Sequence, residues 1–258
     1  MLKQRIIPKF LLKDGRLVKG VRFHENMREA GNPVSTAKVY DSYGVDELIF
    51  LDIGATLDSR KTMTEVIERA ARDIFMPFTA GGGVRTLDDV NRLLRAGSDK
   101  VSVNTAAVDQ PQFINAAART FGDQCITVAI DYRVMPDGRR RVFTHGGTRE
   151  TGLDPVEWAV RAQDASCGEI LLCSIDRDGT MSGYDLDTLE EAVEKLEVPV
   201  IASSGAGTLE HCAEALNAGV SAIAIGSLFL FTDHSPIKVR SALFSRGLNV
   251  RASRSSRN

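Results

Sequence analysis

Short apolar runs alternate with amphipathic stretches along most of the chain. The apolar runs are four to seven residues long and rich in Ile, Leu, Val and Ala. Such continuous runs are typical of strands that are buried on both faces of a parallel sheet. Eight of them predict strands at residues 6–12, 47–53, 77–80, 100–103, 126–131, 169–175, 198–203 and 222–225.

Amphipathic helices are expected between these strands. Several stretches begin with Thr, Asp or Pro, which favour the first turn of a helix. Examples with helical periodicity lie at residues 63–71, 87–96, 111–120, 155–165, 186–196 and 209–218. Strict alternation of strand and helix predicts right-handed crossovers and an α/β fold, a closed (βα)8 or TIM barrel. Longer polar loops at 13–32 and 132–151, with room for a small hairpin, are expected to cover the active site.

The barrel is predicted to consist of two similar halves. Residues 77–108 and 199–230 align at an offset of 122 residues without a gap, and Glu47 meets Glu169 at the same offset. The identities fall at strand starts and glycine turns, where backbone geometry dictates the residue type. One domain is therefore expected over residues 1–250, with half-repeats at about 1–122 and 123–250. A flexible basic tail is expected at 251–258.

The composition of the chain excludes several classes of function. The 258 residues include 32 basic and 34 acidic side chains, a net charge of −2, which offers no electrostatic surface for nucleic acid or an anionic membrane. No apolar run reaches the ~18 residues of a membrane span, and the N-terminus lacks the apolar core of a signal peptide. Four cysteines without CxxC spacing and four scattered histidines favour a cytoplasmic protein with reduced thiols, no metal site and no cofactor.

Aspartates close three of the predicted strands. Active sites of such barrels lie at the carboxyl ends of the strands, which makes Asp52, Asp131 and Asp176 candidates for acid–base chemistry. The alternative for each is a helix cap or a turn-forming residue. Asp131 is the strongest candidate because CITVAID points one carboxylate at the barrel mouth.

Two glycine-rich turns related by the repeat predict phosphate sites. Glycine lets an anion approach backbone N–H groups, and neighbouring hydroxyls add donors, although one such turn alone could be an ordinary tight turn. The candidates are Gly83, Asn104 and Thr105 in the first half and Asp178, Gly179, Ser204, Gly205, Gly226 and Ser227 in the second. Two sites on opposite sides of one mouth indicate an elongated ligand with a phosphate at each end.

Charged residues stand at four predicted strand starts. Arg5, Glu47, Lys100 and Glu169 place two cations and two anions around the N-terminal opening of the barrel. Such a ring can stabilise the barrel. It can also act as a gate, because its ion pairs can exchange partners at little net cost.

These residues make the chain resemble, over nearly its whole length, the cyclase subunit of imidazole glycerol phosphate synthase. The segments KDGRLVKG, PFTAGGGV, DKVSVNTAAV, VAID and SIDRDGT carry the resemblance. It implies a glutaminase subunit docked on the N-terminal face, ammonia passing the ring (Arg5, Glu47, Lys100 and Glu169) and a bis-phosphorylated imidazole nucleotide as substrate. It further implies Lys19, Asp52 and Asp131 as site residues.

The chain departs from this family at positions that matter for chemistry. Leu11 stands where the family has its first catalytic aspartate, Gly146 replaces a serine and Cys173 replaces a threonine. A leucine cannot transfer a proton. The IIPxxLLKDGxLVK start and the TGLDPVEWA segment are more similar to a divergent branch that is associated with amidination of acetamido sugars in bacterial surface polysaccharides. There the barrel and its glutaminase supply ammonia to a separate sugar amidotransferase.

Several functions remain open at this point. The chain could be an ammonia-channelling subunit of the sugar-amidination kind, or an authentic cyclase of histidine biosynthesis. A related phosphoribosyl sugar isomerase would need no ammonia, but it also relies on an acid at the Leu11 position. A non-catalytic scaffold for a partner enzyme is the remaining alternative, which Leu11 permits.

Overall fold

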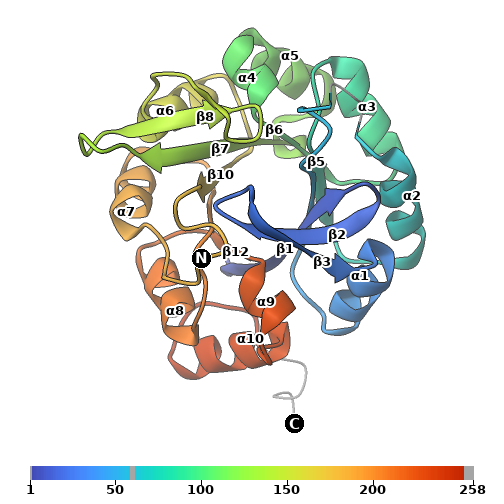
Figure 1. Ribbon diagram of the computed structural model, residues 1–258, viewed down its shortest axis with the longest axis vertical. Coiled ribbons are helices and arrows are strands. Elements are labelled where there is room, and N and C mark those ends of the chain that lie inside the picture. Colours follow the sequence, from blue (N-terminus) through green and yellow to red (C-terminus); the bar gives the residue numbers. More distant parts are fainter. Residues whose placement is uncertain (1, 59–61, 253–258) are drawn as a thin grey trace.

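Parallel strands close into a barrel in the computed structural model, which describes residues 2–58 and 62–252. The eight parallel strands of this described part pair in chain order, and the last one pairs with the first (Figure 1). They are β1 (Arg5–Lys13), β4 (Leu48–Asp52), β5 (Phe78–Gly81), β6 (Lys100–Val103), β7 (Ile126–Val134), β10 (Glu169–Ser174), β11 (Val200–Ser203) and β12 (Ala222–Ile225). The predicted (βα)8 fold is confirmed.

Helices surround the barrel on its outside (Figure 1). They are α1 (Pro33–Ser42), α2 (Thr64–Asp73), α3 (Leu87–Arg95), α4 (Thr105–Asp109), α5 (Gln112–Phe121), α6 (Pro155–Asp164), α7 (Leu186–Lys195), α8 (Leu209–Asn217), α9 (Ser227–Phe231) and α10 (Pro236–Ser245), with a 3₁₀ turn η1 (Asp123–Cys125). Thr86 caps α3 and Thr208, 122 residues later, caps α8 by accepting a bond from a backbone N–H group. The two halves therefore start these helices in the same way.

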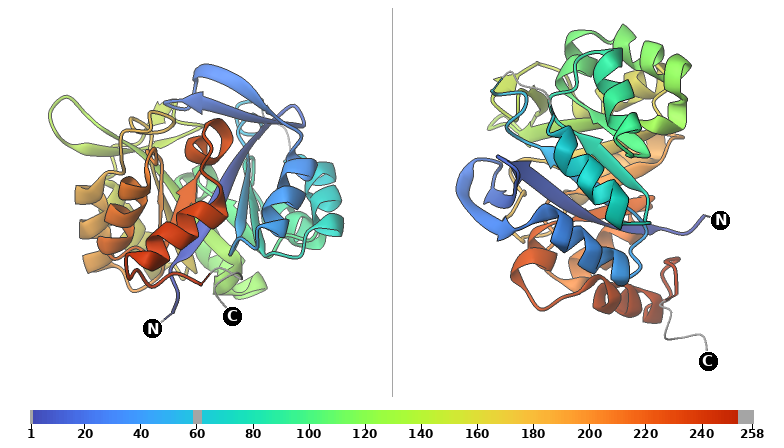
Figure 2. Two further views of the ribbon diagram at one scale, coloured as in Figure 1. Left: turned by 90° about the horizontal axis from the view of Figure 1, so that it is seen from below. Right: turned by 90° about the vertical axis from the view of Figure 1, so that its right-hand side faces the viewer.

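Two hairpins cover the end of the barrel at which the strands finish. β2 (Arg16–Val21) and β3 (Glu25–Gly31) follow β1, while β8 (Arg140–Thr144) and β9 (Arg149–Glu150) follow β7. Figure 2 (left) shows these hairpins at the end opposite to the start of β1. β7 continues three residues beyond the predicted strand end because it pairs antiparallel with β8. The two long polar loops thus form much of the mouth.

The core has two parts that follow the alternation of side chains along each strand. In β1, Ile6, Phe10 and Leu12 pack outward against the helices, and Phe10 contacts Tyr40 of α1 edge-on at 5.2 Å between ring centroids. Ile7 faces inward and packs with inward residues of other strands. Lys9 and Leu11 share the inward face with Ile7, which places both at the mouth.

Two sequence-based expectations concern the C-terminal tail and membrane spans, and the structure adds one finding on the ends of the chain. The basic tail lies, from residue 253 onward, outside the described residues. Gln4 pairs with Val250, so the first and last described segments lie side by side. Across residues 2–58 and 62–252, no helix is both long enough and apolar enough to cross a membrane.

Candidate active site

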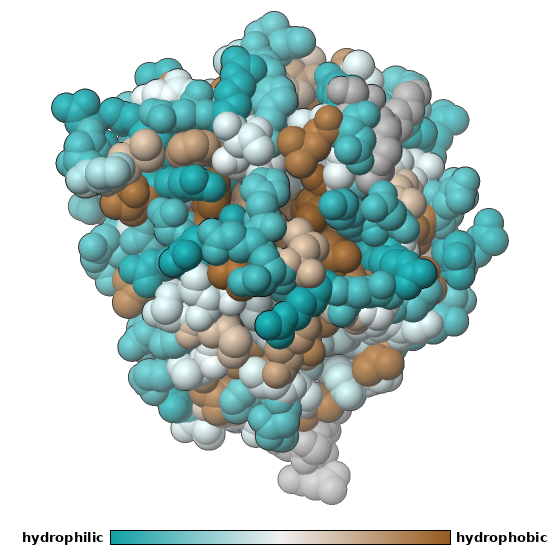
Figure 3. Space-filling model, viewed as in Figure 1, coloured by the Kyte–Doolittle hydropathy of each residue, from teal (hydrophilic) through white to brown (hydrophobic). Residues whose placement is uncertain are grey.

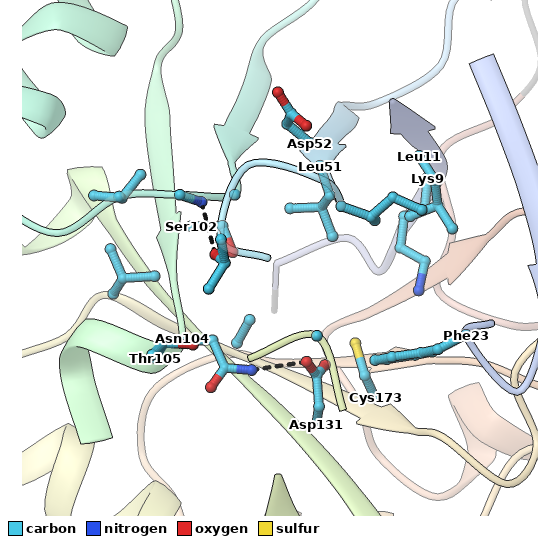
Figure 4. A pocket seen from close by; sticks show the side chains of 18 of the residues that line it. Lys9, Leu11, Phe23, Leu51, Asp52, Ser102, Asn104, Thr105, Asp131 and Cys173 are labelled. Atoms are coloured by element: carbon cyan, nitrogen blue, oxygen red, sulfur yellow. Dashed lines mark hydrogen bonds between the residues drawn. The ribbon is translucent and has the colours of Figure 1, made fainter. Parts of the chain in front are cut away.

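A cavity of about 120 Å³ opens at the mouth of the barrel. Its walls come from the ends of β1, β4, β5, β6, β7 and β10, and Figure 4 shows their side chains converging on one space. In the space-filling view, apolar side chains are visible in the hollow centre of this face, with polar residues around them (Figure 3). The cavity is where chemistry is expected in a barrel of this kind.

Asp131 lies in this cavity as predicted from its place near the end of the fifth barrel strand. The Nδ2 group of Asn104 donates a hydrogen bond of 2.7 Å to its Oδ2 atom. Burial raises the pKa of Asp131 to about 6, although the charge of Lys9 and hydrogen bonds from Cys173 and Asn104 oppose the rise. A carboxyl group with a pKa near neutrality can both accept and donate a proton.

No acid faces Asp131 from β1. Leu11 is buried and lines the cavity together with Leu51 and Val84, so this side of the site is apolar. Cys173 also lines the cavity, and burial raises the pKa of its thiol to about 12, which keeps it protonated. Asp131 is therefore left without a second acid of the kind implied by the resemblance.

Asp52 lies beside the cavity but directs its carboxylate away from it (Figure 4). Its carboxylate oxygens accept hydrogen bonds from the backbone N–H groups of Ala55 and Met63, each 3.2 Å long. These bonds hold the loop after β4. They are the contacts of a turn-forming aspartate, which is the alternative considered for this residue.

The first predicted phosphate set forms one wall of the larger cavity. Gly83, Asn104 and Thr105 all line it. Gly82 has a φ of +94°, and a Cβ atom there would lie 2.1 Å from the carbonyl oxygen of Asp52, so only glycine fits. Thr105 already accepts a hydrogen bond of 3.0 Å from the backbone N–H of His145.

The second predicted phosphate set surrounds a smaller cavity of about 10 Å³. All six predicted residues line it: Asp178, Gly179, Ser204, Gly205, Gly226 and Ser227. Ser204 and Gly205 have φ values of +85° and +103°, and they occupy the repeat positions of Gly82 and Gly83, which also have positive φ. The duplicated turn therefore keeps its backbone conformation in both halves.

Lys19 belongs to this smaller cavity and not to the surroundings of Asp131. Its Nζ atom lies 2.5 Å from Oδ2 of Asp178, and both side chains are buried. Ser204 donates a hydrogen bond of 3.1 Å to the other oxygen of Asp178. Burial opposes ionisation of Asp178, but the charges of Lys9 and Lys19 and these hydrogen bonds together hold its pKa below the usual range.

Lys9 is absent from the residues predicted for the site, yet it lines both cavities. Its Nζ atom donates a hydrogen bond of 2.6 Å to Ser203 and lies 3.8 Å from Asp178. A signal was present in the sequence: Lys9 is the one charged residue of the first apolar run and stands two positions before Leu11. That spacing places the two side chains on the same face of a strand.

At the opposite end of the barrel the four predicted charged residues form a closed ring of ion pairs. Arg5 binds Glu47 at 2.6 Å and Glu169 at 2.8 Å, and Lys100 binds the same two carboxylates. Thr79 also donates a hydrogen bond to Glu47. Burial opposes ionisation of Glu169, but the charges and hydrogen bonds of Arg5 and Lys100 lower its pKa. Cations and anions alternate around the opening.

The remaining departure from the family, Gly146, lies at the rim of the larger cavity. Its carbonyl oxygen lies 2.7 Å from the Nε2 atom of His24, which links the turn between β8 and β9 to the turn between β2 and β3. In the described ranges, no group of three or more His, Cys, Asp or Glu side chains is placed to hold a metal ion.

The fold and the mouth together define a (βα)8 barrel with a carboxyl group, that of Asp131, in the cavity beside one of two duplicated glycine turns. A comparison with protein families agrees: the family model described as histidine biosynthesis protein matches residues 5–235. The chain belongs to this family, whose members are barrel enzymes of histidine biosynthesis.

Proposed function

We propose that the chain is the barrel subunit of a glutamine-dependent enzyme pair and delivers ammonia to a phosphorylated substrate. The observation that carries the proposal is the ion-pair ring at one end of a barrel whose other end holds Asp131 and the two turns suited to phosphate. Ammonia from a glutaminase would enter past Arg5, Glu47, Lys100 and Glu169 and reach the mouth through the barrel.

The N-terminal face offers a surface for such a glutaminase. Leu2 precedes β1 and Phe75 precedes β5, so both lie at the end of the barrel where the strands begin, which is also the end that carries the ring. Their side chains are 91% and 92% exposed. A partner docked on this end would cover both apolar side chains together with the ring.

The mouth favours the branch that supports sugar amidination over the authentic cyclase. A cyclase of the resembled kind uses an acid opposite Asp131, where this chain has Leu11 in an apolar wall. We infer that the barrel, its glutaminase and a separate sugar amidotransferase together convert an acetamido sugar. The cyclase of histidine biosynthesis is the alternative, supported by the family match and the retained Asp131.

Two measurements on purified proteins test the proposal. The chain is mixed with a glutaminase subunit from the same organism, and complex formation and glutamine hydrolysis are measured; we expect a one-to-one complex and stimulated hydrolysis. The absence of both would favour a single-chain sugar isomerase instead. In the second measurement the chain receives ammonium and the bis-phosphorylated imidazole nucleotide, and rapid cyclisation would support the histidine-pathway alternative.

A further inference from the structure

Lys9 joins the two cavities at the mouth. It lies on the inward face of β1, is only 4% exposed, and contributes to the walls of both the larger cavity and the smaller one. The larger cavity holds Asp131 and the smaller one holds Lys19 and Asp178. A ligand that extends from one cavity into the other must therefore pass the Lys9 ammonium group.

Lys9 and Lys19 together carry one more positive charge than Asp178 can balance. Lys19 pairs with Asp178 at 2.5 Å and Ser204 donates to its other oxygen, whereas Lys9 stands further away at 3.8 Å. Two lysines and one aspartate therefore leave one positive charge in excess. A second cation in so buried a place is costly unless another negative group accompanies it.

That negative group lies across the cavity. Figure 4 shows the amino group of Lys9 directed toward the side that carries Asp131 and Cys173. Among the described residues, Lys9 and Asp131 do not approach to ion-pair distance; Lys9 is bonded to Ser203 and Asp131 to Asn104. The two charges therefore flank a space that a substrate atom can occupy.

The surroundings keep Lys9 in its ammonium form. Burial opposes the charged form, but the carboxylates of Asp178 and Asp131 favour it, and the pKa of Lys9 is raised. An ammonium group has three N–H donors and no lone pair. Lys9 therefore suits hydrogen bonding to an oxygen atom and is unsuited to act as a nucleophile.

We propose that Lys9 is a substrate-binding, specificity-determining residue, whose ammonium group donates a hydrogen bond to a hydroxyl or carbonyl oxygen near the substrate's phosphate. The phosphate occupies the smaller cavity, the oxygen lies between Lys9 and Asp131, and the carbon skeleton rests on Leu11. The substrate class is a sugar phosphate or its derivative. This inference rests on the proposed function only in taking the substrate to be phosphorylated.

Binding of two probes to the purified chain tests the inference without a partner. Calorimetry compares inorganic phosphate with ribulose 5-phosphate for the wild type, for Lys9→Met and for the control Lys195→Met, which changes an exposed lysine on α7 in the same way. We expect Lys9→Met to weaken ribulose 5-phosphate binding by about tenfold or more, as for loss of a charged hydrogen bond. Phosphate binding should weaken by clearly less, and Lys195→Met should change neither.

The outcomes separate this inference from the proposed function. Equal weakening of both probes, or no change in either, would overturn the role of Lys9 and leave the phosphorylated substrate intact. A wild type that binds neither probe would overturn both.

A crystal structure of the wild type with ribulose 5-phosphate gives an answer that does not depend on folding of the variant. A sugar oxygen within about 3.2 Å of Nζ supports the inference, and no ligand atom within about 4 Å overturns it.

Discussion

At the scale of single residues, Asp131 is the proposed acid–base group. Its carboxyl group is half-buried at the mouth, accepts a hydrogen bond from Asn104, and has a pKa of about 6. Its ordinary value is 3.8, so the folded protein binds this proton more tightly than the unfolded chain. The residue therefore lowers stability as the pH rises from about 4 to 6, which is the cost of keeping a reactive carboxyl group there.

Asp131→Asn is expected to remove this pH dependence. The amide has no proton to lose, and its oxygen can still accept from Asn104. Relative to the wild type, the variant should gain about 1–2 kcal/mol in free energy of unfolding between pH 4 and pH 7, and it should lose activity. Denaturant unfolding at both pH values measures the gain. The exposed Asp137→Asn is the control, and an equal gain there would contradict the assignment to Asp131.

Leu11→Asp is expected to restore part of a two-acid site. The new carboxyl group would face the larger cavity opposite Asp131, where Leu11 now lies. Because a general acid or base contributes about 10²–10⁴-fold, ammonium-dependent turnover of the imidazole nucleotide should rise by about 10²-fold. Leu11→Asn, which adds polarity but no acid, should not reproduce the rise. A wild type already as fast as Leu11→Asp would show that the site needs no second acid.

At the scale of elements, the strands could be predicted with their bounds, whereas the hairpins could be predicted only as long loops with room for a hairpin. Parallel strands buried on both faces leave continuous apolar runs, so the eight strands could be located closely from the sequence. The β2–β3 and β8–β9 hairpins are rich in charge and glycine, and their bounds follow from pairing with β1 and β7. Lys19 was expected as a site residue without a partner being specified, and the hairpin places it against Asp178, 159 residues away along the chain.

Lys9 also shows that contacts between distant parts of the chain could not be predicted from the sequence. Its inward direction follows from strand alternation, but its partner Ser203 is 194 residues away and is brought to it only by the closure of the barrel. The glycine turns, which we propose bind phosphate, were easier to predict, because Gly82, Gly83 and Gly205 mark in the sequence where positive φ is required. Local signals could therefore locate the turns, while the contacts across the mouth needed the fold.

Gly205→Ala is expected to disrupt the second phosphate turn. Its φ is +103°, and a Cβ atom would lie 2.0 Å from the carbonyl oxygen of Gly183. Gly152 also has positive φ, +74°, but has open space around it, so Gly152→Ala reports conformational strain alone. We expect a cost of about 1 kcal/mol for Gly152→Ala and at least about 2 kcal/mol more for Gly205→Ala, measured by denaturant unfolding. Equal costs would contradict the close contact.

At the scale of the whole molecule, the two ends of the barrel differ in what they carry. The ring of Arg5, Glu47, Lys100 and Glu169 closes the end where strands begin, and the cavity with Asp131 opens at the end where they finish. A stabilising ring alone would also fit this geometry. A channel and a purely stabilising ring can be told apart by removing one charge of the ring. In a channel, this removal affects only the use of ammonia that arrives through the barrel.

The most direct test of ammonia passage is nitrogen transfer by Lys100→Met in the reconstituted complex with the glutaminase. Product formation is measured once with glutamine and once with added ammonium, and thermal unfolding checks that the variant is folded. We predict that the glutamine-dependent rate falls by about tenfold or more, while the ammonium-dependent rate stays within about twofold of the wild type. An equal fall with both nitrogen sources would contradict the channel and leave the ring only a structural role.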